Sequence, residues 1–561
     1  IEYRKQAGSF SGLGFSWKKI GALFKETGEK TKALAAYDSS AYYYTLGKDS
    51  TNLKSLLSDI GDVYYNDKQY QKSFDYYMKL HVLNVLGTDK SVLPNSMYQV
   101  ADAANYFNVD TAKKYAFDCL QISKEIGDQN NEYNAEILLG YIAYKGYDYD
   151  DGNKYFNAGL SVAIKQKNKK LEANCYRMIG LANSNKLDFD KAIPLLQKAI
   201  FLYDSLGDKT MLPPAYRYLG SSIQSKGDFY EARKEYQKSI DLAYAVNSRA
   251  DVGYGNSALT FLYIIQGELS KAQNAADSTY AIFKLLNNSY QMAEAYFNMG
   301  LVSEAKSDGI NAVKYYNMAD SIYKIEKDAS GLSTCKTNIG CVYYYQADFI
   351  NALKYFFEAD KILSTIKIIT EAHILSDINI GETYYYMKDY EKSEKYLTAG
   401  YKMAVEKKVG RMLTISSSFL GTLYYDTKKY DLSEKYLLEG FALAEKSNET
   451  DLYINSGIHL GKLYLALNKP LKAQEYFSKT VRYTKTIDNS KYTWVALYEY
   501  GLSLYNQNKL DSATVYFKQA VAIVENNAQN IFGGEEAKKI YSADERKVDL
   551  YNKLVATLAK N

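Results

Sequence analysis

Apolar and small residues recur along the chain with a period of about 40 residues, and the stretch from Ala215 to Ser239 shows the pattern in full. Counted from Gly220, the pattern consists of apolar, aromatic and small side chains at fixed offsets, namely Tyr216, Leu219, Ile223, Gly227, Phe229, Ala232 and Tyr236. These offsets place the residues on one side of two successive helices. The pattern therefore predicts a pair of amphipathic helices joined by a short turn.

The glycine at position 220 marks a register that runs through the whole chain in steps of 40, with one step of 39 and one of 41. The thirteen anchors are Gly21, Gly61, Ala101, Gly140, Gly180, Gly220, Thr260, Gly300, Gly340, Gly381, Gly421, Gly461 and Gly501. An apolar residue precedes every anchor, a small residue follows about twelve positions later, and a ring or leucine follows at sixteen in most repeats. A glycine inside a helix costs about 1 kcal/mol relative to alanine, so its recurrence needs a packing reason. We expect the glycine to face the small residue, which lets the two helix backbones cross closely.

This register predicts an all-α solenoid of about thirteen antiparallel helix pairs, in which each pair buries its apolar face on its neighbours. We expect a lead-in at residues 1–14, the array at 15–526 and a C-terminal capping segment at 527–561. Repeat seven is degenerate, since Thr260 and Ala276 replace the glycine and the ring. A bend or a change of pitch is expected there.

The glycine, alanine and ring positions resemble the tetratricopeptide repeat in a long form, with a period near 40 instead of 34. The resemblance covers about residues 15 to 526 and departs from the family in lacking the proline that often ends the second helix. It implies a right-handed superhelix with a concave inner face. The segment that follows, from Gly533 to Leu558, is similar to the stretch between long bacterial arrays of this kind and a CHAT peptidase domain.

The amino-acid composition disfavours several classes of function. Charged residues make up 24% and the net charge is +4, a balance too even for a nucleic-acid-binding stripe. No apolar run of about 18 residues is present, so no membrane span is expected. The four cysteines lack metal-binding spacing and are expected to be reduced, which slightly favours the cytoplasm; a periplasmic location stays open if a signal peptide has been removed.

The sequence contains no set of residues that is typical of an active site. The three histidines, His81, His373 and His459, fall in different repeats, and a Cys–His pair would need distant repeats to touch. The chain has no P-loop, zinc-protease motif, dinucleotide fingerprint or nucleophile elbow. We therefore expect no catalytic residue, no cofactor and no metal.

The tetratricopeptide resemblance implies a ligand site on the concave wall, at first-helix positions six and three before the anchor and one, four and five after it. In repeats four to six these positions give a predicted peptide-binding set of Asn134, Tyr141, Tyr144, Asn174, Arg177, Arg217 and Gln224. Arg177 and Arg217 are 40 residues apart and so occupy equivalent positions on adjacent repeats. There, their guanidinium groups could form paired hydrogen bonds with a carboxylate. The later repeats present aromatic and acidic residues instead, such as Tyr344, Tyr385, Glu304 and Glu382. A different interpretation is that the tyrosines only pack the repeat interfaces.

Two functions follow as hypotheses. The first is a non-enzymatic scaffold that binds a peptide or partner segment in the concave groove. The second is a regulatory array that controls an effector, such as a CHAT-type peptidase or a signalling domain, outside this chain.

Overall fold

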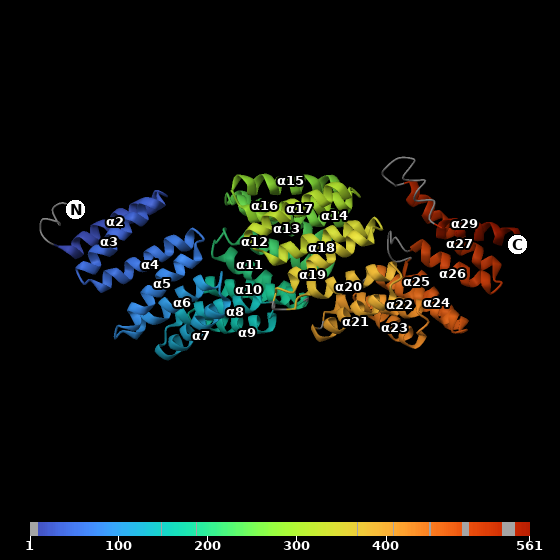
Figure 1. Cartoon of the computed structure of the whole chain (residues 1–561), viewed down its shortest axis with the longest axis horizontal. Helices are drawn as coiled ribbons and strands as arrows, with labels where there is room; N and C mark the ends of the chain where they lie inside the picture. The colour runs from blue at the N-terminus through green and yellow to red at the C-terminus, as the bar shows by residue number, and fades with distance from the viewer. Residues whose placement is uncertain are drawn as a thin grey trace. The chain divides into compact units, whose positions relative to one another are not determined.

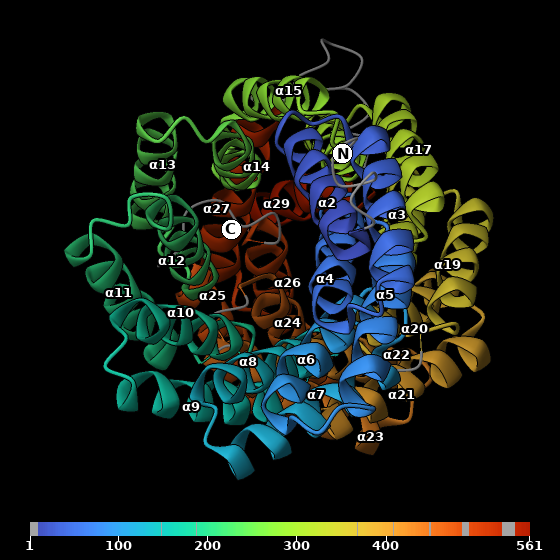
Figure 2. The ribbon, with the colours of Figure 1, turned by 90° about the vertical axis from the view of Figure 1, so that its left-hand side faces the viewer.

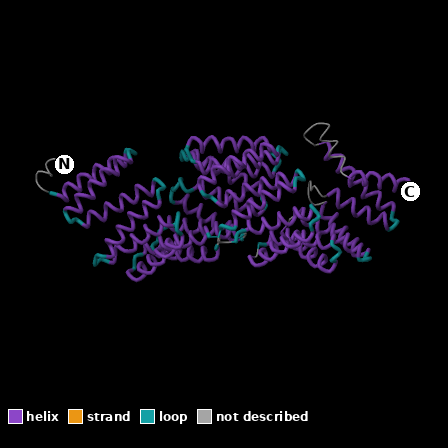
Figure 3. Tube along the Cα trace, viewed as in Figure 1, coloured by secondary structure: helices purple, strands orange, loops and turns teal. Residues whose placement is uncertain are grey.

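The structure is a computed structural model that describes residues 9–146, 148–186, 188–366, 369–407, 409–447, 450–484, 493–529 and 545–560. Every regular element in these ranges is helical, and none is a strand (Figure 3). Contacts divide the chain into two compact units, Ile1–Asn288 and Ser289–Asn561. The boundary follows the second helix of repeat seven, the degenerate repeat.

In the described residues of the N-terminal unit, the helices form seven pairs, with one 3-10 turn in addition (Figure 1). Their bounds are α2 (Phe10–Glu26), α3 (Lys30–Leu46), α4 (Ser50–Asn66), α5 (Tyr70–Val85), η1 (Lys90–Val92), α6 (Leu93–Ala104), α7 (Val109–Ile126), α8 (Gln129–Lys145), α9 (Tyr149–Lys165), α10 (Lys169–Asn185), α11 (Phe189–Ser205), α12 (Leu212–Lys226), α13 (Phe229–Ala245), α14 (Arg249–Ile265) and α15 (Leu269–Leu285).

The C-terminal unit continues the same arrangement. Its helices are α16 (Ser289–Ala305), α17 (Gly309–Glu326), α18 (Ala329–Tyr345), α19 (Phe349–Leu363), α20 (Glu371–Tyr386), α21 (Tyr390–Lys407), α22 (Gly410–Asp426), α23 (Tyr430–Ser447), α24 (Thr450–Ala466), α25 (Pro470–Thr484), α26 (Thr493–Asn506), α27 (Leu510–Gln529) and α29 (Glu545–Lys560). The predicted all-α solenoid of consecutive helix pairs is thus confirmed, while its right-handed superhelical sense stays a prediction.

Helices α2 and α29 are the first and last helices of the described residues. Helix α2 begins at Phe10, inside the stretch expected as a lead-in. Helix α29 packs on α26 and α27, with Leu550 fully buried and the Lys560 ammonium donating to the Tyr505 hydroxyl at 2.8 Å. The division into a lead-in, an array and a capping segment stays a prediction.

Turns in the array are made by residues with left-handed backbone. A residue with positive φ recurs seven positions after the anchor, as at Gly227 (φ 102°) and Lys428 (φ 60°), and again near position 27, as at Gly127 (φ 75°). Aspartates then cap many of the helices that follow: Asp128 accepts from the backbone N–H of Asn131 at 3.1 Å. The left-handed turn residues and the aspartate N-caps end one helix and start the next at a fixed spacing.

The sequence argument expected each anchor glycine to face the small residue twelve positions later. The structure shows that the glycine also faces a larger side chain, sixteen positions later. In every repeat with a glycine anchor, a Cβ added there would meet the side chain sixteen positions on. At Gly140 it would lie 2.6 Å from the ring of Phe156, and at Gly220 2.8 Å from the ring of Tyr236. The residue twelve positions on lies against the glycine carbonyl, to which Ser73 and Ser433 donate at 2.9 and 2.8 Å. Close helix crossing thus rests on a glycine that receives a buried ring.

Repeats three and seven use a different pairing. Their anchors are Ala101 and Thr260, and the partner positions hold Ala116 and Ala276. All four residues are fully buried. Because the large ring is missing in these repeats, the anchor can carry a side chain.

Candidate functional site

The first helices of the pairs form the inner side of the N-terminal unit. Successive first helices contact one another, as α6 does with α8, α10 with α12 and α12 with α14. The second helices α9, α11, α13 and α15 lie on the outer side of the curve (Figure 2). Side chains on the exposed face of α8, α10 and α12 therefore point to a shared inner surface.

The seven predicted site residues all lie on these three helices and are all half-buried. Asn134, Tyr141 and Tyr144 come from α8, Asn174 and Arg177 from α10, and Arg217 and Gln224 from α12.

Arg177 is held in place by Asn174. The Arg177 Nη2 donates to the Asn174 Oδ1 at 3.1 Å, and the Tyr203 hydroxyl donates to the same oxygen at 3.1 Å. The Arg177 Nε is buried and has no hydrogen-bond partner among the described residues. Asn174 thus helps to orient the guanidinium of Arg177.

Arg217 is held by aromatic stacking. Its guanidinium carbon lies 4.4 Å from the ring centre of Tyr218 and 5.2 Å from that of Tyr254. Arg177 approaches the same Tyr218 ring at 5.9 Å. Tyr218 therefore lies between two arginines of adjacent repeats, each in contact distance for a cation–π interaction.

The two arginines differ from Arg233, which lies on the second helix α13. The Arg233 Nη1 forms an ion pair with the Glu268 Oε1 at 3.1 Å, in addition to stacking on Tyr263. Neither Arg177 nor Arg217 has an ion pair with a carboxylate in the described part of the chain. The inner surface thus carries two fixed positive groups without an anion.

Tyr141 lies between charges of opposite sign. Burial raises the pKa of Tyr141; the neighbouring Tyr106 and Tyr218 hydroxyls raise it further, the Arg177 charge lowers it and the Asp102 charge raises it. The Lys145 ammonium lies 4.8 Å from the ring centre of Tyr141. Tyr141 is therefore influenced both by Arg177 of the arginine pair and by Asp102 on α6.

Two predicted residues are engaged within the repeat array. The Tyr144 hydroxyl accepts from the Asn185 Nδ2 at 2.7 Å, across to the next first helix. The Gln224 Oε1 accepts from the Tyr236 hydroxyl at 3.0 Å. Asn134 has no side-chain hydrogen bond among the described residues. The strongest cluster is thus Arg177, Arg217 and the tyrosines around them.

The sequence argument missed several members of this surface. Asp102, Lys145 and Tyr254 occupy offsets that the register rule already contained, one and five after the anchor and six before it. Tyr218, two before the anchor, lies outside that rule. Only the stacking of the two arginines shows that its ring belongs to the site.

First helices of the C-terminal unit present a different surface. The expected acidic residues there accept hydrogen bonds from tyrosines: Tyr316 donates to Glu304 at 2.8 Å and Tyr344 to Glu382 at 2.6 Å. Burial raises the pKa of Glu304, and the hydrogen bond from Tyr316 lowers it. These pairs join helices within and between repeats, so tyrosine in this unit serves interface packing.

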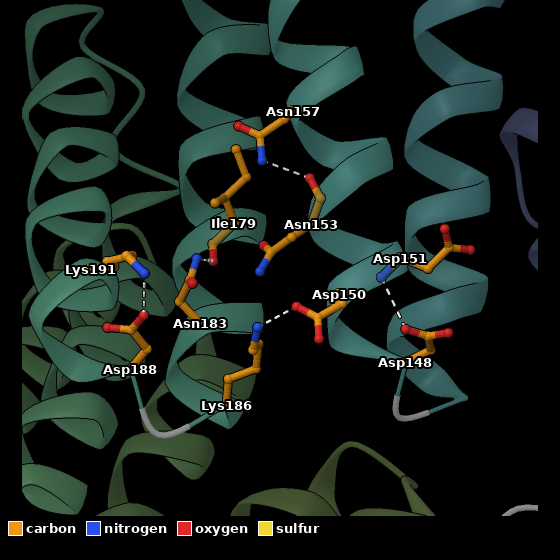
Figure 4. Close-up of polar contacts among 10 residues, drawn as sticks. All are labelled: Asp148, Asp150, Asp151, Asn153, Asn157, Ile179, Asn183, Lys186, Asp188 and Lys191. Carbon is orange, nitrogen blue, oxygen red and sulfur yellow. Dashed lines mark hydrogen bonds and ion pairs between the residues drawn. The ribbon is translucent and has the colours of Figure 1, made fainter.

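The turn edge of repeats four and five shows how neighbouring repeats are fixed to one another (Figure 4). Lys186 forms an ion pair with Asp150 of the preceding repeat, and Lys226 does the same with Asp190 at 2.8 Å. In the first of these turns, Asp148 caps α9 by accepting from the Asp151 backbone N–H at 3.0 Å. In the second, Asp188 forms an ion pair with Lys191 at 2.7 Å. The lysines at this edge are thereby neutralised, in contrast to the two inner arginines.

Burial shifts the pKa values of two thiols and of one histidine. Burial raises the pKa of the Cys175 and Cys335 thiols to about 12, and burial with the nearby Lys462 charge lowers the pKa of His459 to about 4. No group of three or more metal-ligating side chains comes together in the described ranges. Among the helices described, none has the length and apolarity needed to cross a bilayer.

Comparisons with known proteins give similar solved structures but no family and no curated relative. A scan of protein-family models finds no match, and a search of curated proteins finds no relative. Among solved structures, the apo form of the quorum sensor NprR from B. thuringiensis is 15% identical, with 62% of this chain and 97% of that chain covered and a TM-score of 0.44.

Two further structures are similar. The STAND protein PH0952 from Pyrococcus horikoshii, which has a tetratricopeptide repeat sensor, is 14% identical over 79% of this chain and 67% of its own, with a TM-score of 0.44. The apo form of RapI is 18% identical over 48% of this chain and 96% of its own, with a TM-score of 0.38. The helix pairs described above define an all-α solenoid of helical repeats.

Proposed function

We propose that this chain is a non-catalytic interaction scaffold that binds an extended peptide, or a segment of a partner protein, along the inner first helices of the N-terminal unit. The observation that carries the proposal is the pair Arg177 and Arg217, which share the Tyr218 ring and lack a carboxylate partner in the described ranges.

The physical argument is one of preorganisation. Asn174 and two tyrosines already restrict the arginine side chains, so a ligand carboxylate that binds them loses less conformational entropy than it would on free side chains. A guanidinium offers a planar set of donors that matches a carboxylate with two parallel hydrogen bonds. Tyrosines beside the arginines supply flat amphipathic surface for a peptide backbone.

Several features support a binding role over catalysis. The thiols have raised pKa values and are therefore poor nucleophiles at neutral pH. His459 is neutral at physiological pH and is hydrogen-bonded through Nδ1 to the Asn455 carbonyl at 2.9 Å. The groups needed for acid–base or nucleophilic chemistry are thus separated and individually engaged.

The test is capture from a peptide library by the full chain. We expect Arg177→Ala/Arg217→Ala to lose peptides that carry glutamate or aspartate, and the matched variant Arg233→Ala, whose arginine already has a carboxylate, to retain them. Arg177→Lys/Arg217→Lys keeps the charges without the planar fork and should bind at an intermediate level. Equal capture by wild type and the double alanine variant, with unchanged circular dichroism, would remove the proposed site.

A further inference from the structure

A second charged group lies on the same inner surface, two first helices before Arg177. Asp102 is half-buried on α6, between Tyr98 one turn earlier and Tyr106 four residues later. Tyr98 shares a face of α6 with Asp102, whereas Tyr106 lies in the turn that follows the end of α6 at Ala104. Tyr106 itself is 46% exposed, which leaves the site open to solvent.

Rings from the preceding repeat complete the surroundings of Asp102. The Tyr65 ring stands edge-on to Tyr106 at 5.9 Å between centres, and the two hydroxyls are 3.3 Å apart. The Tyr70 ring stacks on Tyr106 at 3.7 Å with an interplanar angle of 5°. Asp102 thus lies beside a fixed set of aromatic faces, the surroundings that attract organic cations.

In the described residues, the carboxylate of Asp102 is under the influence of one cation, Lys145, but forms no direct ion pair with it. No ion pair joins it to a cation in the described part of the chain. Burial raises its pKa, whereas a hydrogen bond from Tyr65 and the charge of Lys145 lower it. The Lys145 ammonium lies over the rings of Tyr106 and Tyr141, at 5.4 and 4.8 Å from their centres. The rim of the site therefore already holds a cation on its aromatic faces.

We propose that Asp102, with Tyr65, Tyr70 and Tyr106, forms a subsite for a basic side chain of the bound peptide, a lysine ammonium or an arginine guanidinium. The inference rests on the proposed peptide-binding function. It adds that the inner surface recognises both charge signs, with a cation at Asp102 and an anion at Arg177 and Arg217.

The order of the charges gives the ligand a direction and a spacing. Tyr141 lies within the electrostatic influence of both Asp102 and Arg177, and α8 is the only first helix between α6 and α10. Neighbouring helices pack about 9 Å apart, so the two subsites are about 18 Å from each other. An extended chain advances about 3.3 Å per residue, which places the basic and acidic side chains about five residues apart.

The experiment measures binding of short acetylated and amidated peptides to the full chain by fluorescence anisotropy. Each peptide carries one lysine and one glutamate at increasing separations in an otherwise neutral sequence. Wild type is compared with Asp102→Asn and with Asp62→Asn, which occupies the same register one repeat earlier and already accepts from the Tyr77 hydroxyl at 2.7 Å. Each protein is also tested with the peptide in which glutamine replaces lysine.

We expect affinity to be highest near the predicted spacing, and either Asp102→Asn or the loss of the peptide lysine to reduce it about tenfold, the effect of a partly desolvated cation–π and charge contact. The two changes together should cost little more than one, because they remove the same contact. Asp62→Asn should bind as wild type does.

The failure of the basic subsite and the failure of peptide binding give different results in this experiment. If Asp102→Asn weakens the lysine and glutamine peptides equally, or if wild type does not discriminate between them, the basic subsite is overturned while peptide binding stands. If wild type binds none of the peptides, the proposed function fails, and the subsite fails with it.

Discussion

A methyl group added at Gly220 would lie 2.8 Å from the Cδ1 of Tyr236, a ring that is 2% exposed. The Tyr236 hydroxyl is tied to Gln224 at 3.0 Å, so the ring cannot move away without losing that hydrogen bond. In each other repeat with a glycine anchor, the side chain sixteen positions on fills the same space, as a ring in most of them and as Leu196, Leu397 or Leu437 in the rest. This packing explains why a helix-weakening residue is kept at the anchor.

Gly220→Ala is therefore expected to destabilise the N-terminal unit although alanine favours helix formation. Overpacking a buried site of this kind costs about 1–3 kcal/mol. Chemical unfolding followed by circular dichroism measures the loss. Gly410→Ala is the control, because a Cβ there meets nothing within 4 Å, and it should be neutral or slightly stabilising. Equal stabilities of the two variants would show that the ring contact is not what selects glycine.

Repeat seven offers the reciprocal experiment. Ala276→Tyr places a ring against Thr260 and should destabilise by about 1–3 kcal/mol through overpacking. Thr260→Gly removes the side chain that the ring would meet, so the double variant should regain at least about 1 kcal/mol relative to Ala276→Tyr alone. Hydrogen exchange on α14 and α15 reports the effect locally. Strictly additive losses would mean that the two positions do not pack as a pair.

Tyr218 is predicted to hold the two inner arginines through its ring and not through its hydroxyl. Tyr218→Ala should lower the affinity for a glutamate-containing peptide by about tenfold, since both cation–π contacts are lost. Tyr218→Phe keeps the ring and should bind within about twofold of wild type. Anisotropy titrations of both variants compare the two roles. A large loss in the phenylalanine variant would instead assign the contact to the hydroxyl.

Asp377 makes the stability of the C-terminal unit depend on pH. Burial, with the charge of Asp360, raises the pKa of Asp377 to about 6, and Lys395 lowers it. The folded state then binds more protons than the unfolded state between the ordinary carboxyl pKa of about 4 and this raised value, so stability falls as pH rises through that window.

Asp377→Asn should remove this dependence and stabilise the unit above pH 6 by up to about 2 kcal/mol. Asp360→Asn removes the second cause of the raised pKa and should flatten the profile in part. Thermal unfolding of the three proteins at several pH values provides the measurement. A wild-type profile that rises with pH over this window would contradict the assignment.

Spacing alone was enough to predict the helix pairs and the adjacency of Arg177 and Arg217, because a fixed repeat places equivalent residues on neighbouring first helices. The spacing could not predict the hydrogen-bond partners of the side chains. Asn174 accepts from Arg177 and Gln224 accepts from Tyr236, and the register alone predicted neither contact. Such hydrogen bonds depend on side-chain directions that periodicity does not contain.

The sequence by itself determined the period, the helical class and the positions of the small residues, since each is a local property repeated thirteen times. Tertiary structure decided which buried group fills the space above each glycine and which charges on the inner surface remain unpaired. Within the described ranges, Arg233 forms an ion pair with Glu268, whereas Arg177 and Arg217 contact tyrosines and an amide and form no ion pair. That difference arises from packing between helices, where distance and burial set the strength of every charge.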